Sequence, residues 1–136
     1  MNRVSRILGI DYGAKRTGLA ISDPSNKYAI PLDVINSTRT YPHIKQLLLD
    51  EDIHTVIIGL AMPMSGKLNT QVTSTMRIAD RIRKLGVDVV LESEHLTSEA
   101  AHDMVRGQVA RSDVRIDDVA AAVILQQYLN SKNSGL

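Results

Sequence analysis

An apolar run near the amino terminus ends in a single acid and then turns back on itself, and this feature constrains the fold more than any other. After Arg6, residues 7–10 are apolar and lead to Asp11, residues 13–16 hold a glycine and two cations, and residues 17–22 form a second, mostly apolar run. Two short apolar runs joined by a glycine turn predict a β-hairpin. Because a buried, unpaired carboxylate is costly, Asp11 needs a metal ion, a neighbouring cation or backbone N–H groups as a partner.

Length and composition limit the class of protein. The 136 residues predict a single domain over 1–136, with a core large enough to need no disulfide, and the chain has no cysteine. No apolar stretch is long enough for a signal peptide or a membrane span, so we expect a cytoplasmic protein without a membrane partner. The net charge of +1 and the lack of Phe and Trp argue against a strongly cationic coat and against a base-stacking platform.

The rest of the chain alternates between strand-like and helix-like segments. A strand over 28–35 contains Pro31 and is therefore expected at an edge or a bulge of the sheet. Further strands are predicted at 55–60 and 87–91, and helices after Pro42, over 70–85, from Thr97 or Ser98 to about Gly107, and from Asp113 or Asp117 to Leu129, with a frayed tail over 130–136. Because parallel strands need crossover helices, this order predicts an α/β fold with a mixed sheet.

Three carboxylate positions fall where such a fold collects functional groups. Asp11 closes the first predicted strand, Glu94 follows the last one, and Asp117 and Asp118 open the final helix, where acids are also favoured by the helix dipole. If the three positions converge, they form an all-oxygen site that suits Mg²⁺ or Mn²⁺ and the two-metal hydrolysis of a phosphodiester. Sequence spacing alone does not show whether the three acids converge.

Lys15 and Arg16 are candidate phosphate contacts, because the turn holds them beside Asp11.

Four stretches of the chain carry a family resemblance. They are residues 9–13 with the cations at 15 and 16, residues 58–60 with Gly66, Glu94 with Leu96 and Thr97, and Asp117 before residues 120–126. In these stretches the chain resembles the YqgF family of RNase H-like proteins, which are described as Holliday junction resolvases or as nucleases of pre-16S ribosomal RNA processing. The resemblance implies an RNase H-like fold with a five-stranded mixed sheet and helices on both faces. It also implies that Asp11, Glu94 and Asp117 are catalytic metal ligands.

The sequence departs from the family pattern around Glu94. Ser93 and His95 stand where family members usually have an acid and an arginine, and the loop over 59–66 is also altered. His95 is therefore a candidate phosphate contact, but an imidazole is a weaker phosphate ligand than a guanidinium. These changes put the cleavage rate in doubt and leave the expected metal ligands in place.

The expected function is a divalent-metal-dependent endonuclease acting on structured nucleic acid, foremost at the 5′ end of pre-16S rRNA, with pre-ribosomal particles as a further partner. One alternative is a resolvase of branched DNA, which would need two sites related by symmetry, and the oligomeric state stays open. Another is a non-catalytic nucleic-acid-binding or ribosome-assembly factor, which the changes at Ser65, Ser93 and His95 favour. A kinase-like or actin-like ATPase would need two lobes, and this chain has residues for one.

Overall fold

The computed structural model describes residues 5–111 and 119–133, apart from the side chains of residues 96 and 111. Its strands are β1 (Arg6–Tyr12), β2 (Arg16–Ser22), β3 (Ala29–Asn36), β4 (Ile53–Leu60) and β5 (Asp88–Ser93). Its helices are α1 (Thr40–Asp50), α2 (Thr70–Arg83), α3 (Glu99–Arg111) and α4 (Ala120–Asn133), with 3₁₀ turns η1 (Ser37–Arg39) and η2 (Glu94–Leu96). None of the described helices is long and apolar enough to cross a membrane.

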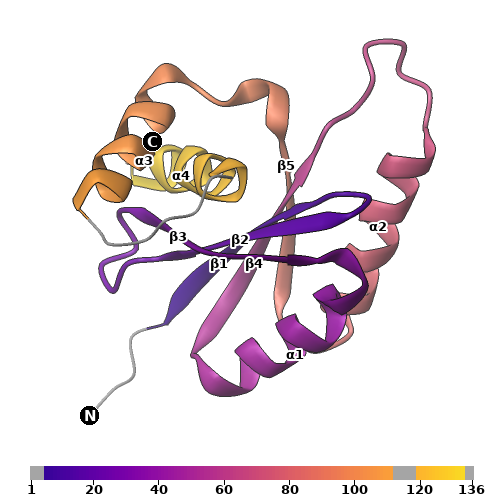
Figure 1. Cartoon of the computed structure of the whole chain (residues 1–136), viewed down its shortest axis with the longest axis horizontal. Coiled ribbons are helices and arrows are strands. Elements are labelled where there is room, and N and C mark those ends of the chain that lie inside the picture. The colour runs from indigo at the N-terminus through magenta and orange to yellow at the C-terminus, as the bar shows by residue number, and fades with distance from the viewer. Residues whose placement is uncertain (1–4, 112–118, 134–136) are drawn as a thin grey trace.

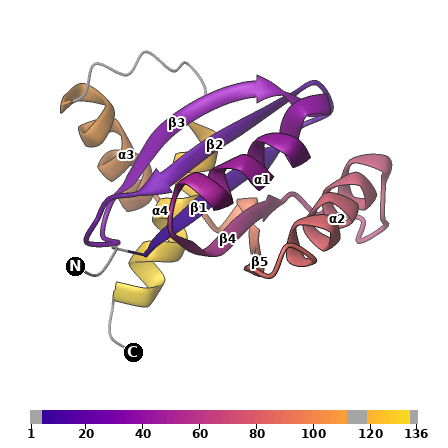
Figure 2. The same ribbon diagram turned by 90° about the horizontal axis from the view of Figure 1, so that it is seen from below.

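The strands form one five-stranded mixed sheet in the order β3-β2-β1-β4-β5 (Figures 1 and 2). β1 is antiparallel to β2 and parallel to β4, and β5 is parallel to β4. The predicted α/β class with a mixed five-stranded sheet is confirmed. β3 lies at an edge, and its register against β2 shifts between Asp33 and Pro31, so the proline occupies an edge bulge as its missing N–H requires.

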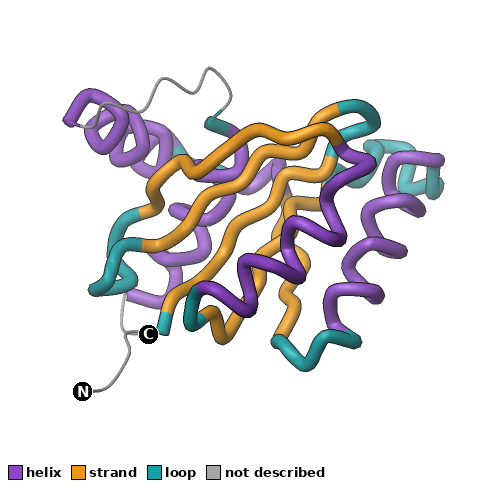
Figure 3. Tube along the Cα trace, turned by 60° about the horizontal axis from the view of Figure 1, so that its bottom comes forward, coloured by secondary structure: helices purple, strands orange, loops and turns teal. Residues whose placement is uncertain are grey.

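Helices cover both faces of the sheet. α1 and α2 lie on one face, and α3 and α4 lie on the other (Figures 1 and 3). Each face has its own apolar core: Ile10, Val56 and Ile82 are fully buried on the first, and Ile57, Val105 and Leu125 are fully buried on the second. α1 and α2 are also joined on their outer side, where the guanidinium of Arg81 lies 3.9 Å from the ring centroid of Tyr41. The central strands are therefore fixed from both sides.

α4 lies directly on β1 because Gly9 has no side chain there. A Cβ at Gly9 would be 2.8 Å from Cβ of Leu125 and 3.0 Å from the carbonyl oxygen of Ala121. A buried glutamine, Gln126, fixes the same helix to the turn between β2 and β3. Its Oε1 accepts from the N–H of Ala29 at 2.9 Å, and its Nε2 donates to the carbonyl of Lys27 at 3.0 Å. The beginning of α4 is thereby held at the carboxyl end of β1.

Two helices extend beyond their predicted ends. α3 continues through Gly107 to Arg111, because Val109 still packs against the core and the glycine sits in open space within the helix. α4 continues to Asn133, four residues into the segment that we expected to be frayed. Its last turn is attached to the body of the protein, since Nδ2 of Asn133 donates to the carbonyl of Asn26 at 3.3 Å. The predicted end at Gly107 and the predicted tail over 130–133 are therefore wrong.

Candidate active site

Asp11 lies at the carboxyl end of β1, the middle strand of the sheet, and is half-buried. Its Cα pairs with Gly18 of β2, and the preceding residue, Ile10, pairs with Ile58 of β4. Within the described residues no ion pair joins Asp11 to Lys15 or Arg16, since the salt bridges found there lie on α2 and α3. The interpretation of Asp11 as one half of a local ion pair therefore has no support in this part of the chain.

Glu94 reaches the same region from β5, two strands away. It opens η2 directly after the strand, and the hydroxyl of Ser93 caps this turn by accepting from the N–H of His95 at 3.3 Å. Gly59 of the intervening strand provides the space for its side chain: a Cβ there would lie 2.7 Å from Oε1 and 3.0 Å from Cγ of Glu94. The carboxylate therefore extends across β4.

A second acid, Glu92, lies two residues earlier on β5, and burial raises the pKa of its carboxyl group.

Two open cavities meet at this pair of acids. The larger, of about 390 Å³, is bounded by Asp11, Glu94, Thr97 just after η2, and residues of α3 and the beginning of α4. The smaller, of about 200 Å³, is bounded by the same two acids together with the ends of β1 and β4 and the first turn of α2. Asp11 and Glu94 thus form the wall between the cavities, so the structure brings together two of the three predicted acids.

The third predicted acid, Asp117, lies outside the described residues, as does Asp118. The described chain resumes at Val119, and both Val119 and Ala120 border the larger cavity. Within the described residues, no group of three or more His, Asp or Glu side chains is placed to hold a metal ion. The described part of the site is a carboxylate pair.

His95 makes a contact that the sequence did not indicate. Its Nε2 donates to the carbonyl oxygen of Met62 at 2.9 Å, because a carbonyl can only accept. The imidazole therefore ties η2 to the long loop between β4 and α2. Ala61, which precedes Met62 in this loop, borders the smaller cavity. His95 is exposed, and the contact to Met62 uses Nε2 and leaves Nδ1 available.

Lys15 and Arg16 lie at the tip of the β1–β2 hairpin, where they border a separate cavity of about 560 Å³. The hairpin is held in place by its backbone: the N–H of Ser37 donates to the carbonyl of Lys15 at 2.9 Å, and the hydroxyl of Ser37 donates to the carbonyl of Gly13 at 2.7 Å. The two cations are thus beside the acid along the chain, but their side chains do not border the cavities that contain Asp11.

Polar residues of the site that sequence reasoning missed include one from each of two helices. His102 of α3 borders the larger cavity, and Gln71 of α2 borders the smaller one, where its Nε2 donates to the carbonyl of Tyr12 at 2.5 Å. Gln71 could have been found, because it lies in the first turn of a helix that follows a strand, and such turns face the carboxyl edge of the sheet. For His102 the sequence gives no comparable signal, since only the docking of α3 decides which way that residue faces.

Solved structures with a similar fold include two Holliday junction resolvases. Thermus thermophilus RuvC in complex with a Holliday junction substrate superposes with a TM-score of 0.68 at 17% identity, covering 96% of each chain. The fowlpox virus Holliday junction resolvase gives a TM-score of 0.54 at 14% identity, covering 93% of this chain and 99% of that one. At such low identities these likenesses show the fold alone, which is the RNase H-like fold of resolvases. Fold and carboxylate pair together define an RNase H-like protein with a candidate hydrolytic site.

The family follows from sequence comparison. The model of the RuvX family, described as a Holliday junction resolvase, matches residues 5–131, and the chain belongs to this family, which is also called YqgF. A Chloroflexus aurantiacus protein is 36% identical over 135 residues, which cover 94% of this chain and 88% of that protein. A Listeria innocua protein is 34% identical over 137 residues, 94% of this chain and 99% of that protein. Both are named "Putative pre-16S rRNA nuclease". The resemblance noted in the sequence is confirmed, and it places the chain in a family of hydrolytic nucleases.

Proposed function

We propose that this protein is a divalent-metal-dependent endonuclease of structured nucleic acid, and that its substrate is the 5′ end of pre-16S rRNA. The observation that carries the proposal is the placement of Glu94 across Gly59, which gives the two cavities a shared carboxylate wall with Asp11. The choice of RNA rests on the names of relatives that are 34–36% identical over nearly the whole chain.

The residues present fit a hard divalent cation. The two residues that border both cavities offer carboxylate oxygens, and the chain has no cysteine; oxygen donors of this kind suit Mg²⁺ or Mn²⁺. We assign Asp11 and Glu94 as ligands, with Asp117 as the third ligand on the strength of the family resemblance. When bound, such an ion would polarise the phosphodiester and make a coordinated water more acidic.

The chain itself contributes position and shape. β1 is hydrogen-bonded to a strand on each side and covered by helices on both faces, so the backbone that presents Asp11 is rigid. Gln71 fixes the carbonyl of Tyr12 at the rim of the smaller cavity. Lys15 and Arg16 would bind substrate phosphates beside the site. His95 would contact a substrate phosphate through Nδ1, while its Nε2 holds the loop at Met62.

Cleavage of labelled pre-16S rRNA and of a four-way DNA junction tests the proposal, each with Mn²⁺ and with EDTA. We expect the wild type to cut the rRNA only with metal and Asp11→Asn to lose this activity. Asp50→Asn, which removes an exposed carboxylate at the far end of α1, should cut as the wild type does. Metal-dependent cutting that persists in Asp11→Asn would contradict the proposed site.

The family description and the fold favour a second candidate, the resolution of four-way DNA junctions. Cutting opposed strands requires two active sites related by symmetry, so this function requires a dimer. Preferential cutting of the junction, together with a dimeric mass in solution, would show that the substrate is branched DNA and not rRNA. Binding of either probe without metal-dependent cutting would instead indicate an assembly factor.

A further inference from the structure

The outer edge of β3 carries a groove that the proposed catalytic residues do not use. One open cavity, of about 560 Å³, is bounded by the tip of the β1–β2 hairpin and by β3, and a second, of about 600 Å³, is bounded by β3 and the start of α1. The two share Val34, Ile35 and Asn36, so both adjoin the end of the edge strand, and together they make a grooved surface there. We call this the β3-edge groove.

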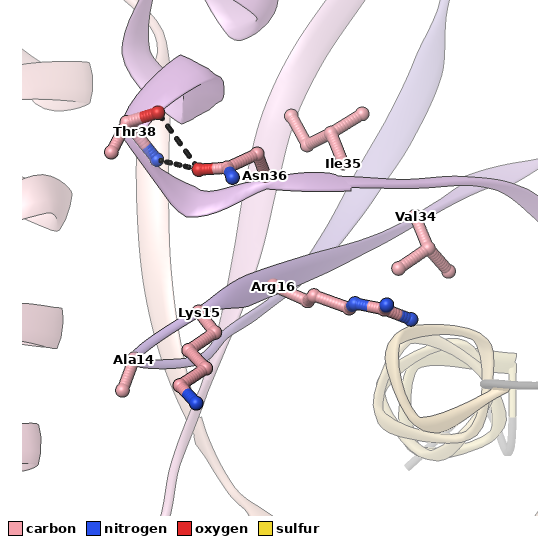
Figure 4. Close-up of a pocket in the computed structure, with 7 residues that line it drawn as sticks. All are labelled: Ala14, Lys15, Arg16, Val34, Ile35, Asn36 and Thr38. Carbon is pink, nitrogen blue, oxygen red and sulfur yellow. Dashed lines mark hydrogen bonds between the residues drawn. The ribbon is translucent and has the colours of Figure 1, made fainter.

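Cations from separate elements surround the β3-edge groove. Lys15 and Arg16 come from the hairpin, and Arg39 comes from η1 just before α1. All three are exposed, and no carboxylate of residues 5–111 or 119–133 forms an ion pair with any of them. Figure 4 shows the hairpin side of the groove, with Arg16 extended on the same side as Val34 and Lys15 at the tip.

The anionic content of the groove is small by comparison. Asp33 is its one acidic lining residue, and its carboxylate accepts from the N–H of Val34 at 2.8 Å. Asp33 directly precedes Val34 on the strand and borders the same cavity as Arg39, so a single acid lies among three cations. His43 of α1 adds a ring N–H that can donate to an oxygen in either charge state. With three cations against one acid, the groove is therefore suited to a polyanion.

The position of the groove connects it to the carboxylate site. Gly13 borders the smaller catalytic cavity, and Ala14 borders the β3-edge groove, so consecutive residues of one hairpin line both. The hairpin is clamped to the start of α1 by Ser37, whose hydroxyl also lies 3.0 Å from that of Thr17. Because this connection is rigid, a bound strand could pass from the acids to the arginines along one edge of the sheet.

An added β-strand fits this edge less well than a polyanion does. Pro31 has no N–H to offer, and the N–H of Val34 is occupied by Asp33. The N–H of Thr38, just past the strand, is likewise taken, by the side chain of Asn36 at 3.0 Å. Pairing with the edge of a second copy would therefore find few open donors.

The geometry points to the β3-edge groove as a binding site for the sugar–phosphate backbone of the nucleic acid flanking the cleavage point, with Arg39 and His43 as its outer contacts. This inference rests on the proposed function, because it assigns the path of that substrate. Backbone contacts of this kind set position and register and read no sequence. They also make binding depend on salt, since each phosphate contact releases counterions.

Equilibrium binding of labelled pre-16S rRNA and of a four-way DNA junction tests the groove, with Asp11→Asn as the parent so that no probe is cut. We expect Arg39→Ala to weaken binding of the preferred probe about 3- to 10-fold and to reduce the slope of log affinity against log salt by about 0.7–0.9. Adding His43→Ala should weaken binding further. Arg83→Ala removes the same charge from the far end of α2, and it should change the affinity less than twofold.

Probes trimmed on one side of the cleavage point sharpen the test. The effect of Arg39→Ala should vanish when the flank that occupies the groove is removed and persist when the other flank is removed. If the parent binds and Arg39→Ala leaves the affinity and the salt slope unchanged, the β3-edge groove is not a binding site for the nucleic acid. The proposed function would then still stand. A parent that binds neither probe would overturn both. If Arg39→Ala dissociated a dimer without changing the affinity, the groove would be an interface between copies.

Discussion

Gly59 is the residue on which the carboxylate pair depends most directly, because its missing side chain lets Glu94 cross β4. In Gly59→Ala the new methyl group would overlap with Cδ1 of Ile124 and lie 2.7 Å from Oε1 of Glu94, so one or both must move. We expect metal-dependent cleavage to fall at least about 10-fold and the free energy of unfolding to fall by about 1–3 kcal/mol, the usual effect of overpacking. Single-turnover cleavage and urea unfolding measure the two effects.

Gly107→Ala is the matched control for that substitution. Nothing lies within 4 Å of a Cβ at Gly107, which is in the interior of α3. Alanine should therefore leave cleavage unchanged and raise the free energy of unfolding by about 0.5–1 kcal/mol, because it restricts the unfolded chain. Full activity in Gly59→Ala would show that the position of Glu94 across β4 is not needed for cleavage.

Asp23 links the stability of the protein to pH through the turn between β2 and β3. Burial alone would raise its pKa, but hydrogen bonds from Ser25, Tyr28 and Lys27 outweigh burial and lower it. The charged carboxylate therefore contributes its full stabilisation at any pH above the pKa of Asp23 in the unfolded chain, which is near 4. This contribution is lost as the pH falls through the lower pKa of the folded protein. Asp23→Ala should lose about 1 kcal/mol at pH 7.

The difference in urea unfolding between wild type and Asp23→Ala should therefore shrink as the pH is lowered from 5 to about 2.5. Asp50→Ala removes an exposed acid that accepts a hydrogen bond from the side chain of Gln46 in its own helix, and it should show a small difference at every pH. A constant difference between Asp23→Ala and wild type over this range would contradict the role of the charged carboxylate in the turn.

At the scale of elements, Gln126 decides where α4 sits. In Gln126→Met, which keeps the approximate size, the N–H of Ala29 and the carbonyl of Lys27 would lose a buried partner. We expect the free energy of unfolding to fall by about 2–4 kcal/mol, because orphaned buried groups keep their desolvation cost. Cleavage should fall as well, since the start of α4 borders the larger cavity. Gln46→Met, on the exposed side of α1, should change neither quantity appreciably.

Elements were predictable where local pattern decides them, and the site was predictable only in part. The β-branched run before Gly59 and the proline in β3 indicate a central and an edge strand, and both are found. The glycine in α3 misled, because tertiary packing of Val109 outweighs local helix propensity. Strand ends indicated Asp11 and Glu94, but their meeting depends on the strand order. Neither the bond from His95 to Met62 nor the orientation of His102 has a signal in local sequence.

At the scale of the whole molecule, stability and the carboxylate site are largely separate. Two apolar cores, one on each face of the sheet, contain most of the fully buried apolar side chains, and the described buried side-chain polar atoms all have hydrogen-bond partners. Asp11 and Glu94 are only half-buried and belong to open cavities rather than to either core. The protein should therefore fold without a metal ion, and EDTA should remove activity without unfolding it.

Metal binding should nevertheless be visible as added thermal stability, because a ligand that binds only the native state shifts the unfolding equilibrium. With a dissociation constant of about 1 mM, 10 mM Mg²⁺ would add about 1.4 kcal/mol and raise the melting temperature by roughly 3–6 °C. Asp11→Asn should lose most of this shift, whereas Asp50→Asn, altered far from the cavities, should keep it. Calorimetry with Mg²⁺ and with an equal ionic strength of NaCl separates specific binding from screening. An identical shift in Asp11→Asn and wild type would place the ion elsewhere, because the carboxylate at the cavity wall would then contribute nothing to its binding.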